Sequence, residues 1–228
     1  MIAHSHRAVT IGISAVLMTS FSLQAAANPL CATPAQRQLV VSALKESPKF
    51  SPAKVASATG IPEAAVVHAM PMEARIPVTM LKFDSVWQAL TEWQDALVIV
   101  LSSDSVFELM GPLPKGEAAR GFFNFDNPDS GYRGHLKVDR LAAIYLLSTD
   151  GDNGETHQVA FYDNDGRRVF SVYVPRNKEG ALQTRPHGRF LRMRQDYGVL
   201  AERSLLTDSS CLWELNARQD TEHSEGRN

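Results

Sequence analysis

The residues with the clearest chemical potential lie between Gly111 and Lys137, a stretch that reads GPLPKGEAARGFFNFDNPDSGYRGHLK. It combines a single histidine, His135, with an aromatic pair, Phe122 and Phe123. Its basic side chains include Lys115, Arg120 and Arg133. Glycine and proline are frequent in it, and backbone of this composition is typical of binding loops rather than of simple connections. We therefore take this stretch as the candidate functional site.

An imidazole beside aromatic and basic side chains has the composition needed to hold an iron porphyrin. His135 would ligate the iron axially, and Phe122 and Phe123 would cover the ring. The propionates would meet basic side chains, namely Lys115, Arg120 and Arg133. A second interpretation stays open, because a single histidine at the start of a strand is commonly a hydrogen-bonded structural residue.

Familiar catalytic motifs are absent from the sequence. It contains no G-x-S-x-G elbow, P-loop, H-E-x-x-H or C-x-x-C pattern. The stretch Thr149–Gly154 (TDGDNG) lacks the spacing and the closing glutamate of a calcium loop, so we expect a solvent-exposed loop there. The sequence therefore names no catalytic residue.

Composition excludes several classes of protein. The chain has 228 residues, 44% apolar and 21% charged, with a net charge of -2, which is enough for one substantial hydrophobic core. No basic run favours nucleic acid or an anionic membrane surface as a partner. No apolar run reaches the ~18 residues of a membrane span, so we expect none in the mature chain.

Residues 1–27 resemble an export signal. Arg7 precedes an apolar region from Ala8 to Phe21, and three alanines end just before Asn28. Export to the periplasm is the interpretation that this pattern favours. The alternative is a misassigned translation start, at Met18 or later.

The two cysteines lie near opposite ends of the chain. Cys31 and Cys211 would be able to form a disulfide in an oxidising compartment, whereas both would stay reduced in the cytosol. Two residues so far apart exclude a cysteine-only zinc site. The polar residues 217–228 are expected to be a disordered tail.

Hydrophobic spacing and capping residues predict a helical cap over residues 34–94. The predicted helices are Gln36–Glu46, one begun by Ser51 and Pro52 and ended by Gly60, one begun by Pro62, and Phe83–Trp93 with Asp84 or Ser85 as its cap. The second and third resemble a helix-turn-helix. Glu63 and His68 are the only polar groups of Ile61–Met70, so binding to DNA is not favoured.

Strand periodicity follows over residues 96–175. The predicted strands are Ala96–Leu101, Val106–Met110, His135–Val138, Leu141–Leu147, His157–Tyr162 and Arg168–Val174. Asp165-Gly166 between two such runs is a strong hairpin signal, and short connections imply antiparallel pairing. With a helical region over residues 184–200, the sequence predicts one α+β domain over 34–200, with N-terminal helices packed on a large antiparallel sheet.

Several ordered blocks of the sequence resemble the HutX/HuvX/ChuX-type haem utilisation carriers. They are VVHAMP (66–71), FDSVWQALTEWQ (83–94), VFELMGPLPKG (106–116), ARGFFNF (119–125), GHLKVDRLAAIYLL (134–147) and AFYDNDGRRVFSVYVPRN (160–177). The resemblance covers about residues 38–195. It implies a cytosolic protein, usually a homodimer, that accepts haem after uptake and passes it on. It also implies a fold like one half of the larger HemS-type haem proteins.

The resemblance implies that His135, in the G-H-L-K block, is the haem-side histidine. Phe122 stands where relatives often place a tyrosine, and Leu101 stands where some place a second histidine. His135 is therefore the implied iron ligand, with water or a partner's ligand on the other face. Met110, Tyr132 and His157 are further candidates.

Three functions are compatible with these observations. The leading one is a haem-binding protein of bacterial haem uptake and utilisation, which binds haem as cargo and transfers it through His135 without catalysing a reaction. The second is an oxygenase-like enzyme that degrades haem. The third is a haem-carrier fold that has lost haem binding and acts as an interaction module.

Overall fold

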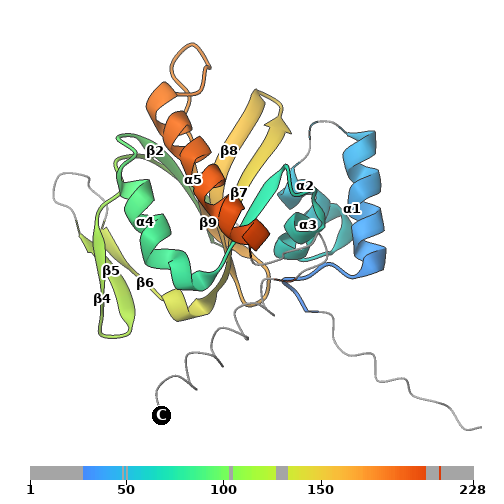
Figure 1. Ribbon diagram of the computed structural model, residues 1–228, viewed down its shortest axis with the longest axis horizontal. Helices are drawn as coiled ribbons and strands as arrows, with labels where there is room; N and C mark the ends of the chain where they lie inside the picture. The colour runs from blue at the N-terminus through green and yellow to red at the C-terminus, as the bar shows by residue number, and fades with distance from the viewer. Residues whose placement is uncertain are drawn as a thin grey trace, which may run out of the picture.

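The computed structural model describes residues 28–47, 49, 51–102, 105–126, 133–203 and 211 (Figure 1). The helices are α1 (Pro34–Glu46), α2 (Pro52–Thr59), α3 (Glu63–Ala69), α4 (Phe83–Thr91) and α5 (Thr184–Arg203), with short 3-10 helices η1 (Met80–Lys82) and η2 (Val138–Arg140). The strands are β1 (Arg75–Val78), β2 (Ala96–Ser102), β3 (Ser105–Gly111), β4 (Gly116–Ala119), β5 (Phe122–Asp126), β6 (Arg133–Leu136), β7 (Leu141–Gly151), β8 (Gly154–Asp163) and β9 (Arg168–Tyr173).

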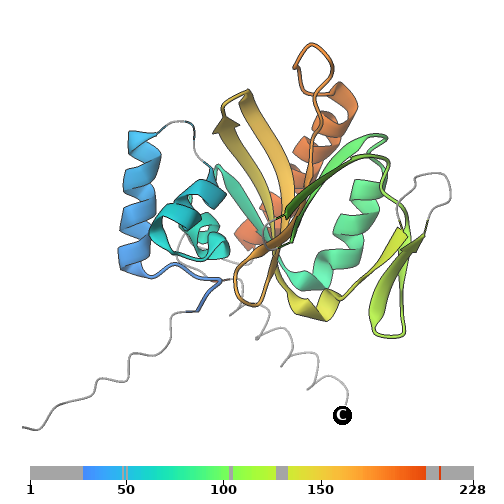
Figure 2. The same ribbon diagram turned by 180° about the vertical axis from the view of Figure 1, so that it is seen from behind.

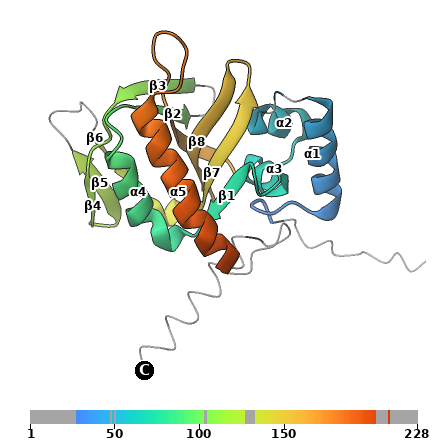
Figure 3. The ribbon, with the colours of Figure 1, turned by 45° about the horizontal axis from the view of Figure 1, so that its top comes forward.

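A six-stranded sheet in the order β1-β7-β8-β9-β2-β3 forms the centre of the molecule. Every neighbouring pair in it is antiparallel, which confirms the predicted α+β class with a large antiparallel sheet. A second, three-stranded sheet in the order β4-β5-β6 lies beside it. Figure 3 shows this small sheet at the end of the molecule that carries α4, far from α1.

Helices cover both faces of the sheet along β7 and β8. On β7, Ile144 and Leu146 join the core under α4 and α5, whereas Tyr145 and Leu147 join the core under α1–α3. Residues 141–147 are buried without a break for this reason. The sequence analysis placed α1–α4 in one helical cap, but α4 packs on the opposite face of the sheet from α1–α3. The helices α1–α3, called the cap from here on, lie to one side of the sheet (Figure 2). Strand β3 is exposed along almost its whole length.

Local capping residues set the helices of the cap, as the sequence indicates. Thr33 accepts the backbone N–H of Gln36 and begins α1, Ser51 accepts that of Lys54 and begins α2, and Gly60 ends α2 with a φ of 70°. Helix α3 is buried throughout from residue 64 to residue 69. These residues are therefore part of the core of the cap.

A buried ion pair joins the cap to the sheet. Arg168 Nε of β9 lies 3.4 Å from Glu63 Oε1 of α3, and the hydroxyl of Tyr162 donates to the same oxygen at 3.3 Å. Arg168 also donates to the Tyr173 hydroxyl at 3.0 Å. Burial raises the pKa of the Glu63 carboxyl, and the guanidinium opposes that rise. Because both charges are largely buried, the loss of one partner would leave the other uncompensated.

A disulfide between Cys31 and Cys211 ties the segment before α1 to the segment after α5. Cys211 is buried, and Cys31 packs against the core of the cap. The backbone N–H of Ala32 donates to Nδ1 of the buried His68 at 2.9 Å, which fixes this segment on α3. His68 is thus a packed structural residue. Within the described residues, no helix has the length and hydropathy of a membrane-spanning segment.

The structure corrects the sequence analysis at three places. Strands β1, β4 and β5 were not predicted. The N-cap position of helix α4 is Lys82, without a side-chain capping bond, rather than Asp84 or Ser85. The stretch Thr149–Gly154, expected to be a solvent-exposed loop, contains the end of β7, a two-residue turn and the first residue of β8. The predicted export signal at 1–27 and the tail at 217–228 lie outside the described residues.

Candidate functional site

The stretch singled out in the sequence folds into the three-stranded sheet, and its side chains alternate between two faces. The inner face carries Phe123, Phe125 and Leu136, which pack against the core under α4. The outer face carries Phe122, Asn124 and His135, all accessible to solvent. The alternation of strand residues thus separates an apolar inner layer from a polar outer layer.

Trp87 of α4 holds the small sheet against the large one. Its ring lies 5.4 Å from that of Phe123 and 5.5 Å from that of Phe125, both on β5, and 6.4 Å from that of Phe170 on β9. Its Nε1–H donates to the Pro114 carbonyl at 3.0 Å, which anchors the proline-rich loop between β3 and β4. This aromatic cluster sets the distance between the two sheets.

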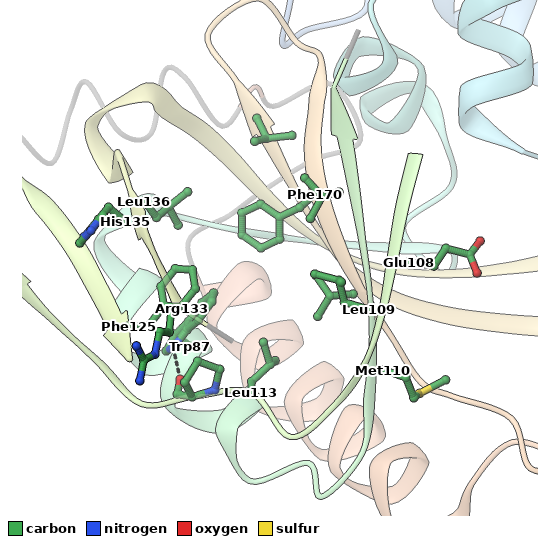
Figure 4. A pocket seen from close by; sticks show the side chains of 14 residues that line it. Trp87, Glu108, Leu109, Met110, Leu113, Phe125, Arg133, His135, Leu136 and Phe170 are labelled. Atoms are coloured by element: carbon green, nitrogen blue, oxygen red, sulfur yellow. Dashed lines mark hydrogen bonds between the residues drawn. The ribbon is translucent and has the colours of Figure 1, made fainter. Parts of the chain in front are cut away.

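A mostly apolar cavity of about 570 Å³ opens between the two sheets (Figure 4). Its apolar walls are formed by Trp87, Val98, Val100, Leu109, Met110, Leu113, Pro114, Phe125, Leu136, Val169 and Phe170. Three charged or titratable side chains contribute to its lining: Glu108, Arg133 and His135. Its volume is within the range of small-molecule sites, about 300–1,000 Å³. Figure 4 shows Arg133 and His135 on one side of the cavity, and Glu108 and Met110 on the other.

His135 is held at this rim by two contacts on the outer face of the small sheet. Its Nδ1 lies 2.7 Å from Oδ1 of Asn124, the residue directly across the strand pair. Its ring meets that of Phe122 edge-on at 6.0 Å. Lys137 Nζ lies 4.8 Å from the centroid of the same phenyl ring, within the range of a cation–π contact. An oriented imidazole therefore lies between an aromatic and a basic side chain.

The structure separates the aromatic pair that the sequence analysis placed on one porphyrin face. Phe122 is 38% exposed beside His135, whereas Phe123 is 5% exposed and contacts Phe83 and Trp87 in the core. Neighbouring residues of a strand point to opposite faces, so the two rings do not form one wall. This part of the prediction is wrong. Phe123 packs in the core on the inner face of the small sheet, and only Phe122 contacts His135.

The predicted basic residues lie at opposite ends of the small sheet. Arg133 begins β6 and lines the cavity, and Lys115 immediately precedes β4 on the neighbouring loop. Arg120 forms the two-residue turn between β4 and β5 with Gly121, and its φ of 56° fits a type I′ turn. Tyr132 lies outside the described residues. Arg133 is therefore the predicted cation that the structure brings to the cavity with His135.

Of the other candidate ligands, Met110 lines the cavity but His157 does not. His157 is 1% exposed, bonds Ser148 Oγ at 2.9 Å and stacks on Phe190 at 4.8 Å between ring centroids. Burial lowers its pKa, with the nearby Glu155 opposing that effect. It is thus a packing residue between β8 and α5.

Two residues of the site were missed in the sequence. Asn124 belongs to no recognised motif, and asparagine is usually a turn residue. Lys137 ends the G-H-L-K block but was assigned no role. The signal that would have found them is strand alternation. Arg133, His135 and Lys137 recur every second residue, so they follow one face of an extended segment.

Comparison with known proteins gives one family. The family model for haem utilisation proteins of the ChuX/HutX kind matches residues 76–190. A curated relative, the intracellular heme transport protein HutX of Vibrio cholerae, is 30% identical over 161 residues, which are 71% of this chain and 83% of that protein.

Solved structures share the fold. The crystal structure of ChuX superposes with a TM-score of 0.65 at 24% identity, covering 70% of this chain and 98% of that chain. The structure of apo-PhuS, a heme-binding protein from Pseudomonas aeruginosa, gives a TM-score of 0.58 at 16% identity over 67% of this chain and 46% of that one. The fold thus corresponds to about half of the larger protein, as the resemblance implied.

Substitution of Gly134 by alanine tests the packing of the small sheet. A Cβ at this position would lie 2.8 Å from the ring of Phe125, which forms part of the cavity wall. We expect Gly134→Ala to lower the free energy of unfolding by about 1–3 kcal/mol, the usual cost of overpacking. Urea unfolding followed by tryptophan fluorescence would measure it. The control is Gly188→Ala on α5, where no atom lies within 4 Å; it should be neutral or stabilising, and an equal loss in both variants would contradict the packing argument.

Proposed function

The chain belongs to the haem utilisation ChuX/HutX family, and on this premise we propose that it binds haem as cargo in bacterial haem uptake and passes it on. His135 is the proposed iron ligand. The names of the relatives, a heme transport protein and ChuX, support the class of ligand. The position of His135 at the rim of an apolar cavity supports the residue.

The side chains at the cavity match the chemistry of haem. A porphyrin needs an apolar environment for its ring, a nitrogen, sulfur or oxygen ligand for its iron, and cations for its two propionates. The cavity supplies an apolar environment against the inner face of the small sheet. His135 and Arg133, on the outer face of that sheet at the rim of the cavity, supply the nitrogen and a cation. Lys137 adds a second cation next to Phe122 on the outer face of the small sheet.

A hemin titration followed by absorbance tests this proposal. For the wild type we expect a Soret band that saturates at one haem per chain. The affinity of His135→Ala for hemin should be weaker by more than about tenfold. The reason for this bound is that loss of an outer-shell partner alone typically costs about 10–100-fold in metal affinity, and loss of the ligand costs more. Added imidazole should restore the wild-type spectrum in the variant.

His187→Gln is the matched control, because His187 lies on α5 and stacks on His157 away from the cavity. It should bind hemin as the wild type does. Absence of a Soret band in the wild type would contradict haem binding and favour the third function, an interaction module. A band that decays steadily with a reductant and oxygen would identify a haem-degrading enzyme, whereas a carrier should give a stable reduced spectrum.

We also propose that this chain is exported to an oxidising compartment, the periplasm. Residues 1–27 have the order of an export signal, and Cys31 and Cys211 form a disulfide of a kind that is rare in the cytosol. The disulfide buries Cys211. The proposed location is distinct from that given in the name of the curated relative, which is intracellular.

Trapping of free thiols in whole cells tests export. Cells making the full chain, and cells making a chain that starts at Asn28, are quenched with a bulky maleimide and compared on a non-reducing gel. We expect the exported chain to be unmodified and the cytosolic chain to carry two labels. Two labels on the full chain, or its recovery in the cytosolic fraction, would overturn the proposal.

The homodimer that the resemblance implies has a candidate surface at β3. Val106, Phe107, Leu109 and Met110 are all exposed on this edge strand. Natural proteins seldom leave a long apolar edge strand uncovered, because it can pair with other chains. We infer that a second copy covers this strand.

Light scattering coupled to size-exclusion chromatography tests the dimer. The wild type should elute as a dimer and Phe107→Glu as a monomer, since a charge in an apolar interface is costly to bury. Leu191→Glu, at an exposed leucine on α5, is the control and should stay dimeric. A monomeric wild type, or equal behaviour of both variants, would contradict this surface.

A further inference from the structure

We propose that Asn124 is a positioning residue that keeps Nδ1 of His135 protonated and thereby assigns Nε2 as the nitrogen that bonds haem iron. The role of the iron rests on the proposed function. The protonation state of the imidazole in the haem-free protein follows from contacts within the chain alone. The two parts can therefore be tested separately.

The side-chain amide of Asn124 has one orientation that the surrounding backbone accepts. Its Nδ2 lies 2.9 Å from the carbonyl oxygen of Ala119, 3.1 Å from that of Phe122 and 3.5 Å from that of Glu117. Carbonyl oxygens only accept hydrogen bonds, and an amide NH₂ only donates. Rotating the amide by 180° would place its oxygen against these three acceptors. The hairpin β4–β5 therefore directs the NH₂ group of Asn124 toward its own backbone carbonyls and the amide oxygen toward His135.

The position of Oδ1 of Asn124 then determines the tautomer of His135. Oδ1 of Asn124 lies 2.7 Å from Nδ1 of His135, and an amide oxygen can only accept. Nδ1 must therefore carry the hydrogen. In the neutral imidazole the other nitrogen, Nε2, is left with its lone pair free to bond a metal.

The strand pairing makes this geometry stable. Asn124 and His135 are direct cross-strand partners on β5 and β6, so their side chains emerge next to each other on the same face. The Phe122 ring, edge-on at 6.0 Å, packs near the imidazole. A hydrogen bond from the second ring nitrogen to a fixed acceptor orients a metal-binding histidine and raises its basicity.

Nitrogen-15 NMR of the haem-free protein, at a pH where the imidazole is neutral, tests the tautomer directly. The His135 signals are assigned by their loss in His135→Gln. We expect a protonated Nδ1 and an unprotonated Nε2 in the wild type. We expect Asn124→Ala to shift the population toward the Nε2-protonated form, because the acceptor is gone. A wild-type imidazole protonated at Nε2, or an unchanged tautomer in Asn124→Ala, would overturn the inference.

Hemin binding gives the second readout. Asn124→Ala should weaken hemin affinity by about 10–100-fold, the usual effect of removing an outer-shell partner of a ligating histidine. The control is Asn153→Ala, at an exposed turn between β7 and β8, and it should change neither readout. Near-UV circular dichroism checks that each variant is folded, and the wild-type NMR result stands without them.

The two proposals fail in different ways. If the wild type shows the expected tautomer but no Soret band with hemin, the haem proposal fails and the role of Asn124 toward His135 stands. If hemin binds through His135 but the tautomer is protonated at Nε2, the assignment of Asn124 fails and the haem proposal stands.

Discussion

The packing of Trp87 between two sheets is the constraint on which the rest of this site depends. A small sheet is stabilised by an apolar face that packs against a helix. Here the inner face of β4-β5-β6 meets the indole through Phe123 and Phe125, and the same indole reaches Phe170 of the large sheet. Its hydrogen bond to the Pro114 carbonyl fixes the loop that leads into the small sheet. The cavity and the orientation of the outer face both follow from this cluster.

On the outer face of the small sheet, the backbone geometry of the β4–β5 hairpin determines the protonation of one side chain, His135. Carbonyl groups of the β4–β5 hairpin hold the amide of Asn124, and that amide meets the imidazole of His135. The turn that closes this hairpin uses Arg120 and Gly121 at positive φ. Arg120, which the sequence analysis assigned to a propionate, thus also forms the turn of this hairpin. Positive φ at a non-glycine residue is uncommon and fits the type I′ turn.

The elements that sequence analysis predicted are those specified by nearby residues. Ser51, Pro52 and Gly60 define α2 without reference to the rest of the chain, and Asp165-Gly166 defines the β8–β9 hairpin. Strand β4 (GEAA) has almost no strand propensity and exists because it pairs with β5. Strand alternation in β5 separates Phe122 from Phe123, and the pairing of β5 with β6 brings Asn124 to His135. The resemblance located the histidine, but only strand register could assign its neighbours.

The disulfide between Cys31 and Cys211 constrains the order in which this molecule is completed. Every helix and strand of the described residues lies between these two cysteines. A ribosome delivers Cys31 early and Cys211 only after α5, so the native bond cannot close while any of these elements is still unsynthesised. Formation of this pair is therefore a late event in biogenesis, and a chain that carries it has already been synthesised as far as Cys211. The disulfide therefore stabilises the fold only after all of these elements have been synthesised.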